Sequence, residues 1–184
     1  MSTRKKRPQA PGIAASGDIE AMIRVDHAGE YGAVRIYEGQ LAVLGTRKSE
    51  TADAIRKMAA QEQDHLKAFD KLVNERRVRP TVLEPVWRVA GFALGTATAM
   101  MGEKAAMACT AAVEEVIDEH YAQQIGKLDG DPALQKKVVA FRHDEIAHRD
   151  EALARGAEQA PGYKLLSETI KAGCRLAIKL SERL

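Results

Sequence analysis

Hydrophobic residues recur every three or four positions along most of this chain, as they do on the buried face of an amphipathic helix. The clearest stripes lie in residues 49–77 and 132–155. Weaker stripes predict three further helices in residues 18–44, 97–128 and 161–183, with Asp18 as the first helix cap. Runs of β-branched residues are scarce, so we expect an all-α protein.

The links between these helices predict how they are connected. The short links at 45–48 and 129–131 favour antiparallel neighbours, and the long stretch 78–102 favours a crossover. We therefore expect an all-α, ferritin-like four-helix bundle with a long crossover and an extra C-terminal helix. At 184 residues the chain suffices for one domain, expected over 18–184 after a disordered basic tail at 1–17.

One pattern occurs twice: a single Glu, then a Glu-x-x-His motif about thirty residues later. The members are Glu30, Glu62 and His65 in the first copy, and Glu114, Glu145 and His148 in the second. All six positions fall within the apolar stripes, so we expect four carboxylates and two imidazoles to point into one core.

Such a core is very unfavourable without compensation, because each buried ionised carboxylate costs several kcal/mol. Two divalent metal ions would balance four carboxylates and use both neutral imidazoles as ligands. Oxygen and imidazole ligands without sulfur suit iron or manganese better than structural zinc. The alternative, ordinary surface pairs of Glu and His, requires two chance motifs that both face the core.

Ligating imidazoles usually donate their other N–H group to a carboxylate. Asp26 and Asp118, one turn from Glu30 and Glu114, are expected in that role, and His120 is a further candidate close to the metal ligands.

Charge and cysteine content narrow the possible partners and the compartment. The net charge is +2, but four of the positive charges lie in the tail at 4–7, so the rest of the chain is slightly acidic and suggests no nucleic-acid partner. Cys109 and Cys174 form no C-x-x-C pair, which favours a reducing compartment. No Gly-rich dinucleotide fingerprint follows an expected strand.

Residues 22–184 resemble the demethoxyubiquinone hydroxylases. The resemblance rests on 24–33 (RVDHAGEYGA), 62–66 (EQDHL), 113–115 (VEE), 141–145 (FRHDE) and 173–178 (GCRLAI). It implies a carboxylate-bridged di-iron monooxygenase that uses O₂ to hydroxylate the ring of a polyprenylated demethoxyubiquinol, late in ubiquinone biosynthesis. It also implies two iron ions held by the six residues above, with Glu62 and Glu145 bridging, and it places His120 and Tyr121 near the site as a His-Tyr pair. The electrons would come from NADH or from the quinol itself.

A long isoprenoid substrate must be drawn from a bilayer. The uncharged run 89–102 is too short to span one, so we expect an interfacial segment with Trp87, Arg88, Phe92 and Leu94 at the membrane. The alternative is a crossover buried against the bundle. The resemblance further implies a peripheral protein on the cytoplasmic face of a bacterial membrane, or on the matrix face of the mitochondrial inner membrane in a eukaryote. The short segment before the match favours the bacterial case.

From the family, a lipid-binding accessory protein and self-association are also expected. Two other functions remain open from the residues alone. A ferritin-like ferroxidase or iron-binding protein would share the six ligands, and a non-catalytic membrane-associated scaffold would hold structural metal.

Overall fold

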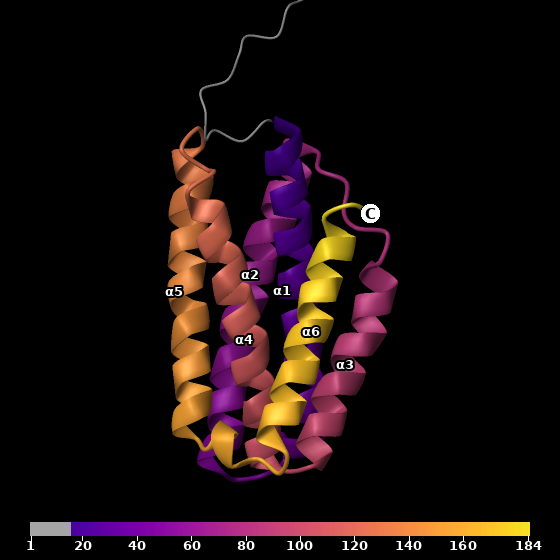
Figure 1. Cartoon of the computed structure of the whole chain (residues 1–184), viewed down its shortest axis with the longest axis vertical. Helices are drawn as coiled ribbons and strands as arrows, with labels where there is room; N and C mark the ends of the chain where they lie inside the picture. The colour runs from indigo at the N-terminus through magenta and orange to yellow at the C-terminus, as the bar shows by residue number, and fades with distance from the viewer. Residues whose placement is uncertain (1–15) are drawn as a thin grey trace, which may run out of the picture.

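The computed structural model describes residues 16–184, and this part of the chain contains helices and no strand. The elements are α1 (Ser16–Leu44), α2 (Glu50–Arg76), α3 (Glu84–Met100), α4 (Glu103–Ile125), α5 (Pro132–Ala154), the 3-10 turn η1 (Ala157–Gln159) and α6 (Tyr163–Ser181). The six α-helices lie roughly along the long axis of the molecule (Figure 1). The expected all-α class is confirmed.

Helices α1, α2, α4 and α5 form the bundle, and α3 and α6 lie side by side along one flank of it (Figure 1). Helix α1 packs against α2 and α3, while α4 packs against α5 and α6. This arrangement matches the expected ferritin-like bundle with an additional C-terminal helix. The expected tail at 1–17 lies outside the described residues except for positions 16 and 17, which begin α1.

Local capping fixes where the two helices with the Glu-x-x-His motifs begin. The Ser49 hydroxyl accepts a hydrogen bond from the backbone N–H of Ala52 at the start of α2. The Asp131 carboxylate accepts one from the N–H of Leu134 at the start of α5, where Pro132 occupies the first turn. These caps fix the first turn of each helix, and the apolar stripe of each helix turns its motif toward the core.

The crossover differs from the expectation in one respect. Most of the stretch 78–102 is itself a helix, α3, and the following helix begins at Glu103 rather than near residue 97. The break is at Gly102, whose φ of 114° no L side chain adopts readily. It lets the chain reverse between α3 and α4. Helix α4 also ends at Ile125, three residues earlier than expected, and α1 begins two residues before its expected cap at Asp18.

Glycines allow α3 to lie very close to α1. A Cβ atom on Gly95 would lie only 2.0 Å from the carbonyl oxygen of Ile36, and one on Gly39 only 2.3 Å from that of Phe92. Side chains at these positions would force the helices apart. One face of α3 is therefore packed on α1, and its other face carries exposed apolar residues such as Val86 and Val89. No helix among residues 16–184 is long and apolar enough to cross a membrane.

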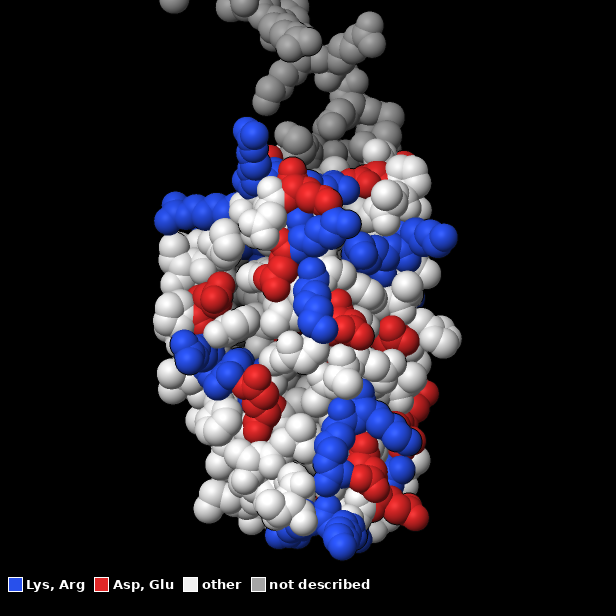
Figure 2. Space-filling view, turned by 180° about the vertical axis from the view of Figure 1, so that it is seen from behind, with Lys and Arg blue, Asp and Glu red and all other residues white. Residues whose placement is uncertain are grey.

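On the face seen in Figure 2, positive and negative side chains of the described residues are interspersed rather than separated into areas of one sign.

Candidate metal centre

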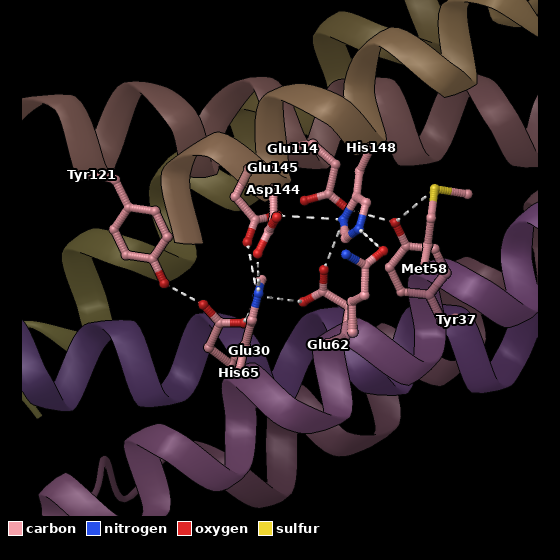
Figure 3. A network of polar contacts seen from close by, with 11 residues as sticks. Glu30, Tyr37, Met58, Glu62, His65, Glu114, Tyr121, Asp144, Glu145 and His148 are labelled. Atoms are coloured by element: carbon pink, nitrogen blue, oxygen red, sulfur yellow. Dashed lines mark hydrogen bonds and ion pairs between the residues drawn. The ribbon is translucent and has the colours of Figure 1, made fainter. Parts of the chain in front are cut away.

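The six residues of the repeated pattern meet in the middle of the bundle. Glu30 comes from α1, Glu62 and His65 from α2, Glu114 from α4, and Glu145 and His148 from α5. All six are buried, with at most 3% of each residue exposed. Figure 3 shows their side chains converging from opposite sides of the bundle.

The oxygen and nitrogen atoms that could bind a metal ion fall into two groups, and two carboxylates belong to both groups. Glu30, Glu62, His65 and Glu145 form one group, called position 1 below; Glu62, Glu114, Glu145 and His148 form the other, position 2. Within each group one ligand atom per residue lies within 4.8 Å of the others. Glu62 and Glu145 belong to both groups, which is the arrangement required of bridging carboxylates.

The six side chains leave many polar atoms without hydrogen bonds. Eight buried oxygen and nitrogen atoms of these residues have no hydrogen-bond partner within the described chain. They include both carboxylate oxygens of Glu62 and of Glu145, and the Nδ1 atoms of both histidines. Buried polar atoms are almost always hydrogen-bonded. A cluster of unpaired oxygen and nitrogen atoms that could each bind a metal ion, aimed at common points, therefore fits a pair of bound cations.

Burial and mutual repulsion oppose ionisation of these carboxylates in the metal-free protein. Burial, followed by the neighbouring Glu145, raises the pKa of Glu62 well above its ordinary value, and the same two causes raise the pKa of Glu114. Burial also raises the pKa of Glu145, partly offset by a contact with His65. Divalent cations would relieve this repulsion, because they favour the charged carboxylates.

The pKa values of the two histidines in the cluster shift in opposite directions. Burial alone would lower the pKa of His65, but the carboxylates of Glu145 and Glu30 outweigh it and raise the pKa to about 11. The Nδ1 atom of His65 lies 3.1 Å from Glu145 Oε1 and 3.5 Å from Glu30 Oε2. For His148, burial lowers the pKa below its ordinary value. Its Nδ1 atom lies 3.0 Å from Glu62 Oε1.

A tyrosine holds each of the two carboxylates that are not shared. The Tyr37 hydroxyl donates to Glu114 Oε1 at 2.7 Å, and the Tyr121 hydroxyl donates to Glu30 (Figure 3). Burial, followed by the adjacent glutamate, raises the pKa of both tyrosines well above the ordinary value. Both therefore remain protonated donors, which leaves the second oxygen of each carboxylate to face the cluster.

Comparison with known proteins identifies the family of this chain. The model of the family described as "Ubiquinone biosynthesis protein COQ7" matches residues 17–181. The chain is 57% identical to the 3-demethoxyubiquinol 3-hydroxylase of Rhodospirillum rubrum, over 90% of this chain and 78% of that protein. It is 53% identical to the mitochondrial NADPH-dependent 3-demethoxyubiquinone 3-hydroxylase of Homo sapiens, with the same coverage. The relative from Saccharomyces cerevisiae, named 5-demethoxyubiquinone hydroxylase, is 38% identical over 93% of this chain and 80% of that protein.

The chain belongs to the COQ7 family. The family resemblance inferred from the motifs is confirmed.

In this COQ7 family member, the side chains that contact the Nε2 atoms of His65 and His148 are not the ones expected from the sequence. His65 Nε2 lies 3.1 Å from Asp144 Oδ2, and His148 Nε2 lies 3.1 Å from Gln61 Oε1. Each partner immediately precedes the Glu of the opposite motif, so helix α5 supports the His of α2 and α2 supports the His of α5. The sequence prediction missed both residues, although the signal was their place directly before Glu145 and Glu62.

Asp26 and Asp118 were predicted to support these imidazoles, and that prediction is wrong. Asp118 accepts hydrogen bonds from Arg142 and Arg149. Asp26 lies 3.1 Å from His120 Nε2 and accepts a hydrogen bond at 2.7 Å from the Gln124 amide. Asp26 and Asp118 each lie one helical turn, about 5.4 Å along the axis, from the nearest cluster glutamate. They therefore meet partners at a different level of the bundle and not the ligating His.

An apolar cavity of about 490 Å³ lies between α1, α3, α4 and α6. Gly29 and Ala33 line it on α1, and Val113 and Ile117 line it on α4. These positions flank Glu30 and Glu114 along their helices, so the cavity borders the helices that carry two of the six cluster residues. Cβ atoms on Gly29 and Gly32 would meet nothing within 4 Å, so close packing does not require glycine at these two positions.

The residues expected at a membrane interface divide into two pairs. Arg88 and Phe92 are exposed on α3, and Phe92 packs against the Arg35 guanidinium. Trp87 and Leu94 are half-buried and line the cavity, and the Trp87 indole N–H donates to Ser181 Oγ at 3.0 Å. This last contact joins α3 to α6 at the wall of the cavity.

Proposed function

We propose that this protein is a 3-demethoxyubiquinol 3-hydroxylase that carries out a late ring hydroxylation in ubiquinone biosynthesis with two bound iron ions. The observation that carries the proposal is the buried cluster of four carboxylates and two imidazoles, in which eight oxygen and nitrogen atoms have no hydrogen-bond partner within the described chain. It occurs in a chain 57% identical to a relative of that name. The family membership favours this activity over a ferritin-like ferroxidase or a scaffold with structural metal.

Glu62 and Glu145 would bridge the two ions, with Glu30 and His65 completing one ligand set and Glu114 and His148 the other. The oxygen and imidazole ligands suit iron or manganese. When bound, a reduced iron pair supplies the activation of O₂ that ring hydroxylation requires. The protein's own contribution is to hold the carboxylates in place through Tyr37 and Tyr121.

The apolar cavity is the proposed substrate site. Its lining is almost wholly apolar, which suits a prenylated ring and excludes water from it. The ring would approach the cluster along the faces of α1 and α4 beside Glu30 and Glu114, while the prenyl tail would leave between α3 and α6. Gly29, Gly32 and Gly173 line this route, where the absence of side chains widens it.

Reduced nicotinamide nucleotide is the proposed electron source. Several relatives, including the human protein, carry "NADPH-dependent" in their names. The His120–Tyr121 pair is the proposed connection to the cluster, because Tyr121 donates to Glu30 and His120 is held at the edge of the bundle by Asp26. Oxidation of the quinol itself is the alternative source of electrons.

Peripheral membrane binding through α3 and α6 is also proposed. Val86 and Val89 on α3 and Leu176 on α6 are more than half exposed, on the two helices that wall the cavity. Exposed Arg88 on α3 and exposed Lys179 on α6 would meet lipid phosphates. The same surface could bring the substrate directly from the bilayer, on the cytoplasmic face in a bacterium or the matrix face in a mitochondrion. An accessory lipid-binding protein or a second copy of the chain would be further partners.

The test is reconstitution of the purified protein with two equivalents of ferrous iron. It is then supplied with a short-chain demethoxyubiquinol, O₂ and NADPH, NADH or no nucleotide. We expect mass spectrometry to show one added oxygen, derived from ¹⁸O₂, on the ring. Product formed at the same rate without nucleotide would assign the electrons to the quinol. Iron-loaded protein that consumes O₂ without modifying the ring would favour a ferroxidase.

A further inference from the structure

The two metal positions are built almost symmetrically from the two sequence repeats. Both share Glu62 and Glu145 and add one unshared glutamate and one histidine. Each unshared glutamate accepts a hydrogen bond from a buried tyrosine. Each histidine points its Nδ1 atom into the cluster and its Nε2 atom outward.

The two positions differ in the side chain that accepts a hydrogen bond from the outward Nε2 atom of the histidine. A neutral His that binds metal through Nδ1 carries its hydrogen on Nε2 and donates it from there. At position 1 the acceptor for His65 is the carboxylate of Asp144, at 3.1 Å. At position 2 the acceptor for His148 is the amide oxygen of Gln61, also at 3.1 Å. The two nitrogen-to-oxygen distances are the same, and the two acceptors differ in charge.

A carboxylate acceptor draws the N–H hydrogen more strongly than an amide does, and so makes the imidazole a stronger electron donor to a metal. It also adds a negative charge close to the cation. Within residues 16–184 no Lys or Arg pairs with Asp144, whose ion-pair partner is His65 itself. Asp26 is the other acid behind position 1, but it is paired with His120.

We propose that Asp144 makes the two metal positions unequal, so that position 1, with Glu30 and His65, binds a divalent metal ion more tightly and fills first. Asp144 and Gln61 act as positioning residues in this proposal, through the histidines they contact. The inference rests on the proposed di-metal centre. The expected difference is about tenfold, at the lower end of the roughly 10- to 100-fold effect of such partners, since the Asp144 side chain is 38% exposed and partly screened by water.

Titration with Mn²⁺, followed by the electron paramagnetic resonance signal of the free ion, measures both positions without catalysis. We expect the wild-type chain to bind two ions in two steps. Glu114→Ala should leave position 1 as the principal site, and Glu30→Ala should leave position 2. In the Glu114→Ala background, Asp144→Asn should weaken binding about tenfold. In the Glu30→Ala background the same change should have little effect.

Gln61→Glu provides the reciprocal test, because it places a carboxylate beside His148 with almost no change in shape. It should tighten Mn²⁺ binding in the Glu30→Ala background, a gain that misfolding cannot produce. Asp64→Asn is the matched control, since Asp64 is an exposed acid on α2 that pairs with Lys67.

The possible failures are distinguishable. Two wild-type ions bound with equal affinity, an equal effect of Asp144→Asn in both backgrounds, or no gain from Gln61→Glu would overturn the inequality while leaving the di-metal centre intact. A folded wild-type chain that binds fewer than two ions would refute the centre itself.

Discussion

The Tyr37 hydroxyl on α1 donates a 2.7 Å hydrogen bond to Glu114 on α4, across the core of the bundle. It fixes one oxygen of Glu114, and the other oxygen faces the cluster without a hydrogen bond from the described residues. The helix that contributes Glu30 therefore also orients a carboxylate from a different repeat. The bundle and the proposed metal centre are built by the same contacts.

Replacing Tyr37 by Phe should release Glu114 and weaken metal binding about 10- to 100-fold while leaving the fold in place. Iron content after dialysis, measured by mass spectrometry, checks this expectation. Tyr31→Phe on the same helix is the control and should retain its iron. Unchanged iron content in the Tyr37→Phe protein would show that the hydrogen bond does not position the carboxylate for a metal.

The metal-free protein should lose stability as the pH rises. The pKa values of Glu62, Glu114 and Glu145 are raised above 4.5, chiefly by burial, so the folded state binds more protons than the unfolded chain above that pH. This contribution to the free energy of unfolding is complete below about pH 4.5 and is lost as the pH rises through the raised values. The raised pKa of His65 acts in the same direction, and the lowered pKa of His148 opposes it.

Denaturant unfolding at pH 5 to 8, with chelator or with Mn²⁺, measures this dependence. We expect the metal-free free energy of unfolding to fall over this range by at least about 1.4 kcal/mol, the value of one pKa unit. Mn²⁺ should remove the fall or reverse it, because metal binds the ionised carboxylates. Glu62→Gln should flatten the metal-free profile. A metal-free protein that gains stability with pH would contradict the electrostatic account.

Filling the cavity should impair catalysis without affecting metal binding. A Cβ atom on Gly32 meets nothing within 4 Å and borders the cavity, so the side chain in Gly32→Leu would occupy the space proposed for the substrate. We expect kcat/KM to fall about tenfold or more, with two irons retained. Gly126→Ala, in open space outside the cavity, is the control. Unchanged kinetics in Gly32→Leu would place the substrate elsewhere.

Charge introduced on α3 and α6 should release the protein from membranes. The double variant Val89→Glu, Leu176→Glu changes two residues that are 69% and 58% exposed, so the fold should tolerate it. Flotation with vesicles of anionic and zwitterionic lipid is the measurement, and we expect the variant to remain in the dense fraction. Val139→Glu on α5, 47% exposed and away from the cavity, should float like wild type. Equal flotation of the double variant would move the membrane surface to another part of the molecule.

The sequence predicted the helices and the six cluster residues because both depend on periodicity within one helix. Glu62 and His65 are three residues apart on a stripe that must be buried, and no tertiary information is needed to place them in the core. Contacts between helices were not predictable in this way. Asp144 reaches His65 from another helix, and Asp26 turns to His120 rather than to a ligand.

The helix α3 and the cavity were missed for a related reason. The uncharged run 89–102 was expected to be an interfacial segment from its length and lack of charge, with a crossover buried against the bundle as the alternative. Its close packing on α1 depends on Gly39 of α1 lying against the Phe92 carbonyl and on Gly95 of α3 lying against the Ile36 carbonyl. The cavity exists only where α3 and α6 lie against α1 and α4, so the pattern within a single helix does not reveal it.

The most direct test of the proposed hydroxylase is expression in a strain that lacks its own demethoxyubiquinone hydroxylase, with quinones measured by mass spectrometry. The wild-type chain should restore ubiquinone. The Glu145→Ala chain, which lacks one of the two shared carboxylates, should leave demethoxyubiquinone accumulated. Accumulated demethoxyubiquinone with a wild-type chain that is folded and iron-loaded would contradict the assigned reaction.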